Sequence, residues 1–113
     1  MKLLTKDIRK KLPPVLSQDG KGDEAIVHVK FFTPWSHWTW YATEGEPVLD
    51  EEGNEVDFMF FGLVYGLEKE LGYFCLTELE AVRGPAGLRI ERDIHFTPKP
   101  LSESTDPCGI FRE

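Results

Sequence analysis

Three histidines and one pair of carboxylates have side chains suited to catalysis or metal binding. His28, His37 and His95 lie far apart in the chain and match no helix-spaced zinc motif. They meet only if strand pairing brings them together, and a pocket of these histidines with a nearby carboxylate would suit small-ligand binding or hydrolysis. Glu44 and Glu46 share one face of an extended strand. They are therefore either an acid–base pair or acids at the mouth of a solvated loop.

The two cysteines and the run DEEGNE at residues 50–55 carry weaker signals. Cys75 stands in the apolar run YFCLTE, where a thiol is more often a small buried hydrophobe than a nucleophile. Cys108 lies near the C-terminus, and we expect it to be inert. The glycine of DEEGNE follows the first acid too soon for a helix-loop-helix calcium site. The sequence therefore predicts no catalytic residue, no metal site and no cofactor.

Acidic side chains dominate the middle of the chain. The whole chain has 20 acids against 13 Lys and Arg, and residues 41–67 contain seven of these acids with no Lys or Arg. We expect an acidic lobe that steers a basic protein partner, such as a nucleic-acid-binding host or defence protein whose DNA site the lobe imitates. The simpler alternative is that the acids only keep the protein soluble. The predicted binding residues of this lobe are Glu44, Glu46, Glu51, Glu52, Glu55 and Asp57.

Aromatic residues cluster just before these acids, in WSHWTWYATEGE at residues 35–46. Alternation places Trp38 and Trp40 on one face of a strand, and His37 and Tyr41 on the other. If a helix covers the first face, both indoles belong to the core. The rival interpretation is a stacking platform for single-stranded nucleic acid, which normally comes with a basic groove. The acids that follow would repel phosphates, so the sequence argues against a nucleic-acid partner.

Strands are the elements expected to position most of these residues. Residues 25–32 and 37–43 alternate in the manner of an antiparallel hairpin. Residues 57–66 are nearly continuously apolar, as in a central strand, and Gly62 within them indicates a bulge or a close neighbouring backbone. Shorter strands are expected at residues 72–76 and 93–96.

Two short helices are also expected. Thr5 can cap a helix over residues 5–12, which has apolar residues at four-residue spacing. A second helix is expected over residues 77–83, with Thr77 and Glu80 as its capping box. The polar face of the first helix is either an ordinary solvated surface or a phosphate-binding patch, formed by Lys2, Lys6 and Arg9.

Several longer runs carry a family resemblance across most of residues 1–104. They are MKLLTK, KLPP, VKFFTP, WTWYATEGE, FFGLVYGLEKELGYF, LTELEAVRGPAGLRIERD and FTPKPLSE. Together they resemble the family of small bacterial proteins known as domain of unknown function 2958. The resemblance implies no reaction, ligand or functional residue. Its members are often carried by plasmids, integrated elements and phages, which implies an accessory role in transfer or in conflict with host defences.

Length and patterning together predict an α+β protein with a single domain over residues 1–113. We expect a mainly antiparallel meander sheet of four or five strands packed with two short helices, and an irregular C-terminal tail at residues 98–113. The longest apolar stretch, residues 58–67, is about half the length of a membrane-spanning helix. No secretory leader opens the chain, so we expect a reduced cytoplasmic protein. The oligomeric state stays open. The expected function is non-catalytic binding of a protein partner.

Overall fold

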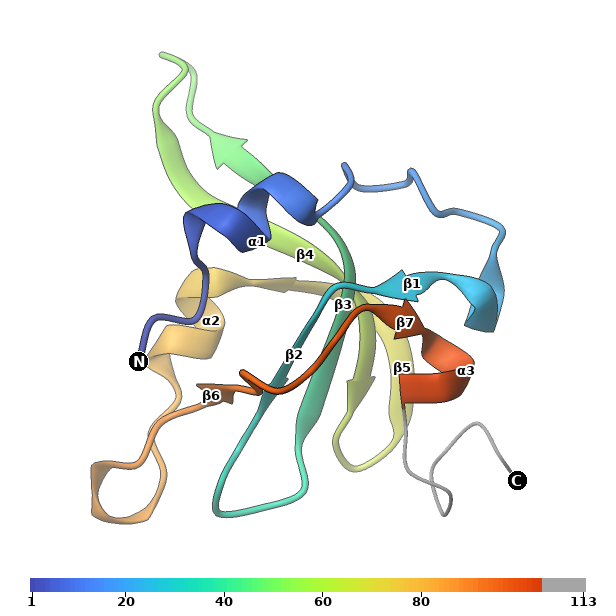
Figure 1. Cartoon of the computed structure of the whole chain (residues 1–113). Helices are drawn as coiled ribbons and strands as arrows, with labels where there is room; N and C mark the ends of the chain where they lie inside the picture. The colour runs from blue at the N-terminus through green and yellow to red at the C-terminus, as the bar shows by residue number, and fades with distance from the viewer. Residues whose placement is uncertain (105–113) are drawn as a thin grey trace.

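A five-stranded antiparallel sheet organises the chain in a computed structural model, which describes residues 1–104 (Figure 1). Strands β2 to β5 are consecutive in both sequence and space, and β6 returns to the other edge beside β2. The predicted α+β class and antiparallel meander are therefore confirmed. A second, two-stranded sheet joins β1 to β7. The strand bounds are β1 Ile26–Val27, β2 Val29–Phe32, β3 Thr39–Leu49, β4 Glu55–Tyr65, β5 Lys69–Cys75, β6 Glu91–Arg92 and β7 Lys99–Pro100.

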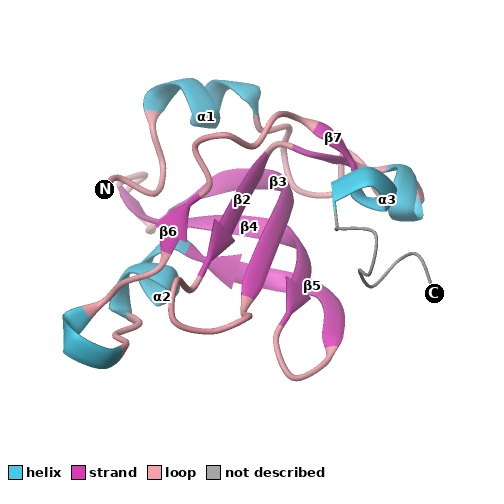
Figure 2. Ribbon diagram, turned by 60° about the horizontal axis from the view of Figure 1, so that its bottom comes forward, coloured by secondary structure: helices cyan, strands magenta, loops and turns pink. Residues whose placement is uncertain are grey.

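Short helices lie around the sheet, with α2 and α3 at opposite ends of it (Figure 2). Their bounds are α1 Lys6–Lys11, α2 Leu76–Ala81 and α3 Leu101–Ser104, with 3₁₀ turns η1 Gly22–Glu24 and η2 Pro85–Gly87. The first helix was predicted correctly, including its cap, because Thr5 Oγ1 accepts a hydrogen bond from the Ile8 amide at 3.2 Å. None of the helices described in residues 1–104 is long and apolar enough to cross a bilayer.

Hydrophobic residues form clusters on both faces of the sheet. The main cluster lies on the face covered by α1 and α2, where Phe60 packs against Phe31 and Phe74 with ring centroids 5.4 and 5.3 Å apart. The second cluster contains Tyr41 and Leu63, which alternate with main-cluster residues along their strands and so point to the opposite face. Its other buried members are Ala25, Val27 and Leu101.

The tryptophan prediction is right for Trp40 and only partly right for Trp38. Trp40 lies in β3 and Trp38 directly precedes this strand, and the centroids of their rings are 5.9 Å apart. Trp40 is 8% exposed within the main cluster, whereas Trp38 is 36% exposed. Trp38 precedes the strand and packs on Gly66, at the end of the sheet. Water therefore reaches part of the Trp38 indole.

The predicted strand at residues 25–32 is interrupted at His28. Residues before the break form β1, which leaves the main sheet to pair with β7, and residues after it form β2. The His28 amide still donates to the Ala42 carbonyl at 2.9 Å, which keeps the break close to β3. As a result Val27 joins the second cluster and Val29 the main one, whereas the alternation predicted over residues 25–32 would place both on one face.

Two further predictions in the second half of the chain were wrong in detail. The last strand of the main sheet is β6, whereas residues 93–96 form a turn in which Asp93 Oδ1 accepts from the His95 amide. The capping box of α2 is formed by Cys75 and Glu78. Thr77 is not the cap because Asp57 accepts hydrogen bonds from both its amide and its hydroxyl.

The segment predicted as an irregular tail is ordered structure up to Ser104. Residues 99–104 form β7 and α3, with Leu101 only 2% exposed, because the Leu101 amide donates to the Ala25 carbonyl and its side chain fills the second cluster. The remainder of the predicted tail, residues 105–113 with Cys108, lies outside the described residues.

Candidate functional site

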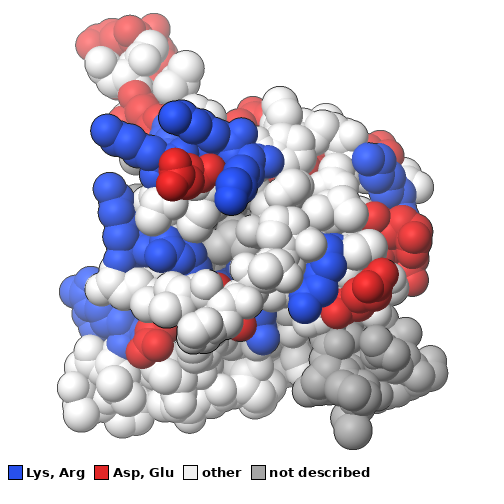
Figure 3. Space-filling model, viewed as in Figure 1, with Lys and Arg blue, Asp and Glu red and all other residues white. Residues whose placement is uncertain are grey.

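The acidic lobe expected from the sequence is the outer part of the β3–β4 hairpin. Pairing of β3 with β2 ends at Ala42, and pairing of β4 with β5 ends at Met59, so the residues beyond pair only with each other. This two-stranded arm projects from the body of the molecule (Figure 1). Acidic side chains cover its tip at the top left of Figure 3.

The turn at the tip of the hairpin is held by Asp50. Its Oδ1 accepts hydrogen bonds from the amides of Glu52 and Asn54, both at 2.9 Å, and Gly53 supplies a residue with φ +85°. The backbone hydrogen bond from Asn54 lowers the pKa of Asp50, and further hydrogen bonds from Glu52, Gly53 and the Asn54 side chain act in the same direction. The turn thus has a defined shape although it is surrounded by water.

Two exposed apolar side chains flank the acids of this turn. Leu49 and Val56 are each 57% exposed, although both belong to strands. Glu51 and Glu52 are exposed, and their side chains form no hydrogen bond or ion pair with residues 1–104. The tip therefore offers apolar surface together with carboxylates that have no partner in the described chain. The charge pattern of the sequence indicated the acids, whereas Leu49 and Val56 stand in no apolar run that would have indicated them.

Glu55 and Asp57 attach the base of the arm to the body. Glu55 forms an ion pair with Arg9 of α1 through both carboxylate oxygens, which raises the pKa of Arg9 and lowers that of Glu55. The Arg9 guanidinium also lies 4.9 Å from the centroid of the Phe58 ring. Asp57 binds Thr77 of α2, and hydrogen bonds to its carboxylate outweigh burial and lower its pKa.

Glu44 and Glu46 hold the chain that follows α1. Glu44 is only 2% exposed, and its two oxygens accept from the Leu16 amide and from Thr43 Oγ1. Glu46 accepts from the Val15 amide at 2.9 Å. These bonds fix the segment where it crosses the edge of β3. The two carboxylates that we interpreted as an acid–base pair or a loop mouth thus serve as acceptors for backbone amides.

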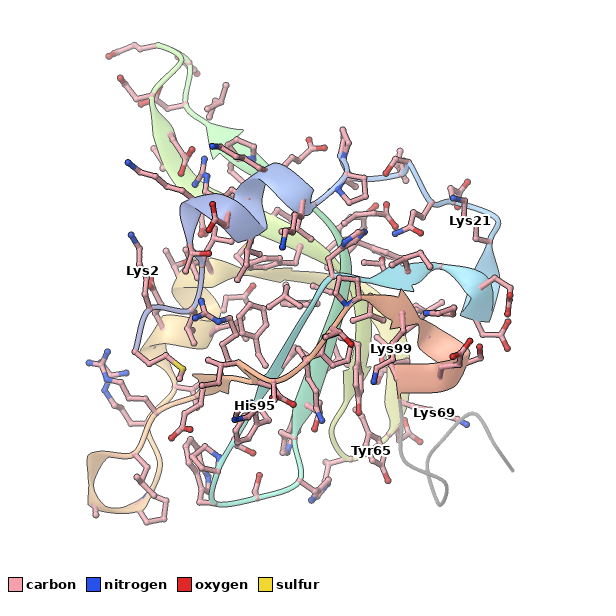
Figure 4. The ribbon with its side chains drawn as sticks, viewed as in Figure 1. Lys2, Lys21, Tyr65, Lys69, His95 and Lys99 are labelled. Atoms are coloured by element: carbon pink, nitrogen blue, oxygen red, sulfur yellow. The ribbon has the colours of Figure 1, made fainter. Side chains whose placement is uncertain are left out.

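The structure places the three histidines in separate surroundings. His28 lines a cleft between α1 and the chain after β6, whereas His37 Nε2 lies 2.9 Å from the Gly66 carbonyl oxygen. His95 is exposed on the segment between β6 and β7, where Figure 4 labels it. Within the part of the chain that the structure describes, no three His, Cys, Asp or Glu side chains gather in a way that could hold a metal ion.

Cys75 ends β5 and is partly buried beside two carboxylates. Burial first, and then the negative charges of Asp57 and Glu78, raise the pKa of its thiol. The thiolate, which is the nucleophilic form, is therefore disfavoured at neutral pH. Cys75 is thus a partly exposed capping residue that belongs to neither hydrophobic cluster, and our interpretation of it as a small buried hydrophobe was wrong. The raised pKa gives no support to nucleophilic catalysis.

Fold and site together define a small α+β domain whose most distinctive surface feature is a projecting hairpin with an acidic tip. The chain belongs to the family described as protein of unknown function (DUF2958), whose model matches residues 3–107. The family membership suggested by the sequence runs is thereby confirmed. No curated protein and no solved structure matches the chain.

Proposed function

We propose that this protein is a non-catalytic binding protein whose β3–β4 hairpin tip docks onto a basic surface of a protein partner. The observation that carries the proposal is the exposure of Leu49 and Val56 at the two ends of the turn that carries the exposed Glu51 and Glu52. Removing apolar side chains from water lowers the free energy of the complex, and the carboxylates orient a basic partner.

The hydrogen bonds of the hairpin divide the six predicted acids into two groups. Glu44, Glu46, Glu55 and Asp57 are engaged with the protein's own backbone or side chains. Glu51 and Glu52 are the acids that we assign to the partner. A nucleic-acid-binding host or defence protein has the basic surface that this contact requires, and such a partner would suit an accessory role on a mobile element.

The test begins by capturing partners from the protein's own host with the tagged wild-type chain. The same capture is then made with the variants L49S/V56S and E51Q/E52Q. A captured protein that depends on the hairpin is purified and its affinity is measured by titration calorimetry. We expect L49S/V56S to weaken binding by about tenfold or more, because the partner then has no apolar side chains to bury at these two positions. For E51Q/E52Q we expect weaker binding whose salt dependence is reduced.

The matched control is E68Q/E70Q, which removes two exposed acids from the β4–β5 hairpin and changes the net charge by the same amount. We expect this control to bind like the wild type. If E51Q/E52Q and E68Q/E70Q lost the same affinity, binding would depend only on the net charge of the protein. Full affinity in L49S/V56S, with an unchanged melting temperature, would refute the assignment of the hairpin as the docking element.

A further inference from the structure

A cleft of about 220 Å³ lies on a different part of the molecule from the hairpin tip. Its walls come from three segments that are distant in sequence: α1, the junction between β1 and β2, and the chain after β6. The polar groups on these walls belong to Thr5, Lys11, His28, Arg92 and Asp93. In Figure 3, Lys and Arg side chains gather over α1 and below it, on the side of the molecule where these segments meet.

His28 stands at the break between β1 and β2, which places its ring in the wall of the cleft. Its Nδ1 atom is covered by the protein but has no hydrogen-bond partner among the described residues. Because Nδ1 is covered, the ring can meet a ligand in the cleft through its Nε2 side. Burial first, and then the charge of Lys11, lower the pKa of His28, so the free imidazole is neutral near pH 7.

The positive charges at the cleft are not neutralised by the protein. Lys11 is exposed and forms no ion pair within residues 1–104. Arg92 donates through Nη1 to the Lys2 carbonyl at 2.8 Å, which leaves the rest of its guanidinium available. The acid on the wall is Asp93, and it is already paired with Lys30 at 3.8 Å. Two cationic side chains therefore remain for a ligand.

The cleft is smaller than most pockets that enclose a whole small molecule, which measure about 300 to 1,000 Å³. It is large enough for one tetrahedral oxyanion. Arg and Lys beside each other are the residues that most often bind phosphate, and a neutral imidazole and a hydroxyl such as that of Thr5 can donate further hydrogen bonds to its oxygens.

From these observations we propose that the cleft binds the phosphate group of a small phosphorylated molecule, through Lys11, Arg92 and His28. The rest of the ligand extends out of the cleft, past the apolar side chains of Ile94 and Phe96 on the same wall. This site differs from the phosphate patch considered from the sequence, since Arg9 of that patch is paired with Glu55. It is also independent of the hairpin, so either proposal can fail alone.

The experiment titrates the whole protein with inorganic phosphate at constant ionic strength and follows the imidazole signals by long-range ¹H–¹⁵N NMR. His37 serves as the internal reference because it does not line the cleft and its ring lies against the Gly66 carbonyl. We expect the His28 signals to shift with a saturable one-to-one curve while the His37 signals stay in place. Bound phosphate should also raise the pKa of His28, because its negative charge offsets the positive charges of Lys11 and Arg92. Asp93 should contribute little to this change, since it stays paired with Lys30. An unshifted His28 would overturn the proposal.

The decisive variants are K11M and its matched control K10M. Both remove one exposed lysine from the same helix, but only Lys11 lines the cleft. K11M should weaken phosphate binding about tenfold or more, whereas K10M should leave it nearly unchanged. R92K, which keeps the charge but loses the planar guanidinium, should give an intermediate loss. Equal effects of K11M and K10M would show that binding depends only on the net charge of α1.

A competition arm distinguishes a small ligand from nucleic acid. Glycerol phosphate should displace inorganic phosphate from His28 at a similar concentration. A single-stranded oligonucleotide, compared at equal phosphate concentration, should compete no better than inorganic phosphate does. Much tighter competition by the oligonucleotide, with a steep salt dependence, would indicate a backbone-binding surface and would overturn the assignment to a small phosphorylated ligand.

Discussion

Glu44 shows how a single buried side chain can have a structural role that its residue type does not reveal. It is 2% exposed and accepts from the amide of Leu16, a non-glycine residue that has a positive φ of 77°. Positive φ is unfavourable for leucine, so the segment needs contacts that hold it in this conformation. The carboxylate of Glu44 provides one of them.

Replacement of Glu44 by alanine should therefore lower the free energy of unfolding by about 1 to 3 kcal/mol, because the Leu16 amide loses its acceptor in a partly buried position. Chemical denaturation measures the change. The control is E52A, at an exposed position that should change stability by no more than about 0.5 kcal/mol. If the two variants were equally stable, the Glu44 hydrogen bonds would not contribute to the fold.

At the scale of elements, the centre of the sheet depends on a close approach between β3 and β4. A Cβ atom built at Gly62 would lie 1.9 Å from the Tyr41 carbonyl oxygen, which is backbone and cannot rotate away. A register shift follows Ala42, the residue paired with Gly62. The sequence indicated either a bulge or a close backbone at this glycine, and the structure contains both.

Gly62→Ala should destabilise the protein by about 3 kcal/mol or more, because the two strands must separate to admit the methyl group. Gly72→Ala is a matched control in the next strand. Gly72 is paired with Gly62, yet a Cβ atom there would meet nothing within 4 Å. Thermal unfolding of both variants makes the comparison. Similar melting temperatures would contradict the close approach seen at Gly62.

At the scale of the whole molecule, the sheet is covered on both faces by segments from the two ends of the described chain. The N-terminal segment contributes Leu3 and Leu4 to the main cluster, and α3 contributes Leu101 to the second cluster. In the view of Figure 3, basic residues gather near α1, and acids gather at the tip of the hairpin arm and again on the opposite side of the molecule. The two proposed binding sites lie near α1 and at the tip of the arm.

The contribution of the second cluster can be measured with Leu101→Ala, which should cost about 2 to 5 kcal/mol since the side chain is 2% exposed. Leu67→Ala removes the same atoms at a position that is 87% exposed and should change stability by no more than about 0.5 kcal/mol. Denaturant titrations of both variants would show whether α3 is part of the cooperative fold. If the Leu101 variant were as stable as the Leu67 variant, α3 would not be part of the cooperative fold.

Local sequence patterns were sufficient to predict the features that depend on neighbouring residues. Strand alternation placed Trp40 in the core and Tyr41 on the other face, and the cap at Thr5 located the first helix, because backbone geometry repeats over two to four residues. The break at His28 and the partners of Glu44 could be known only from the folded chain. Both depend on segments far away in the chain, namely β7 and residues 13–16, and no local pattern encodes which distant backbone will supply the partner.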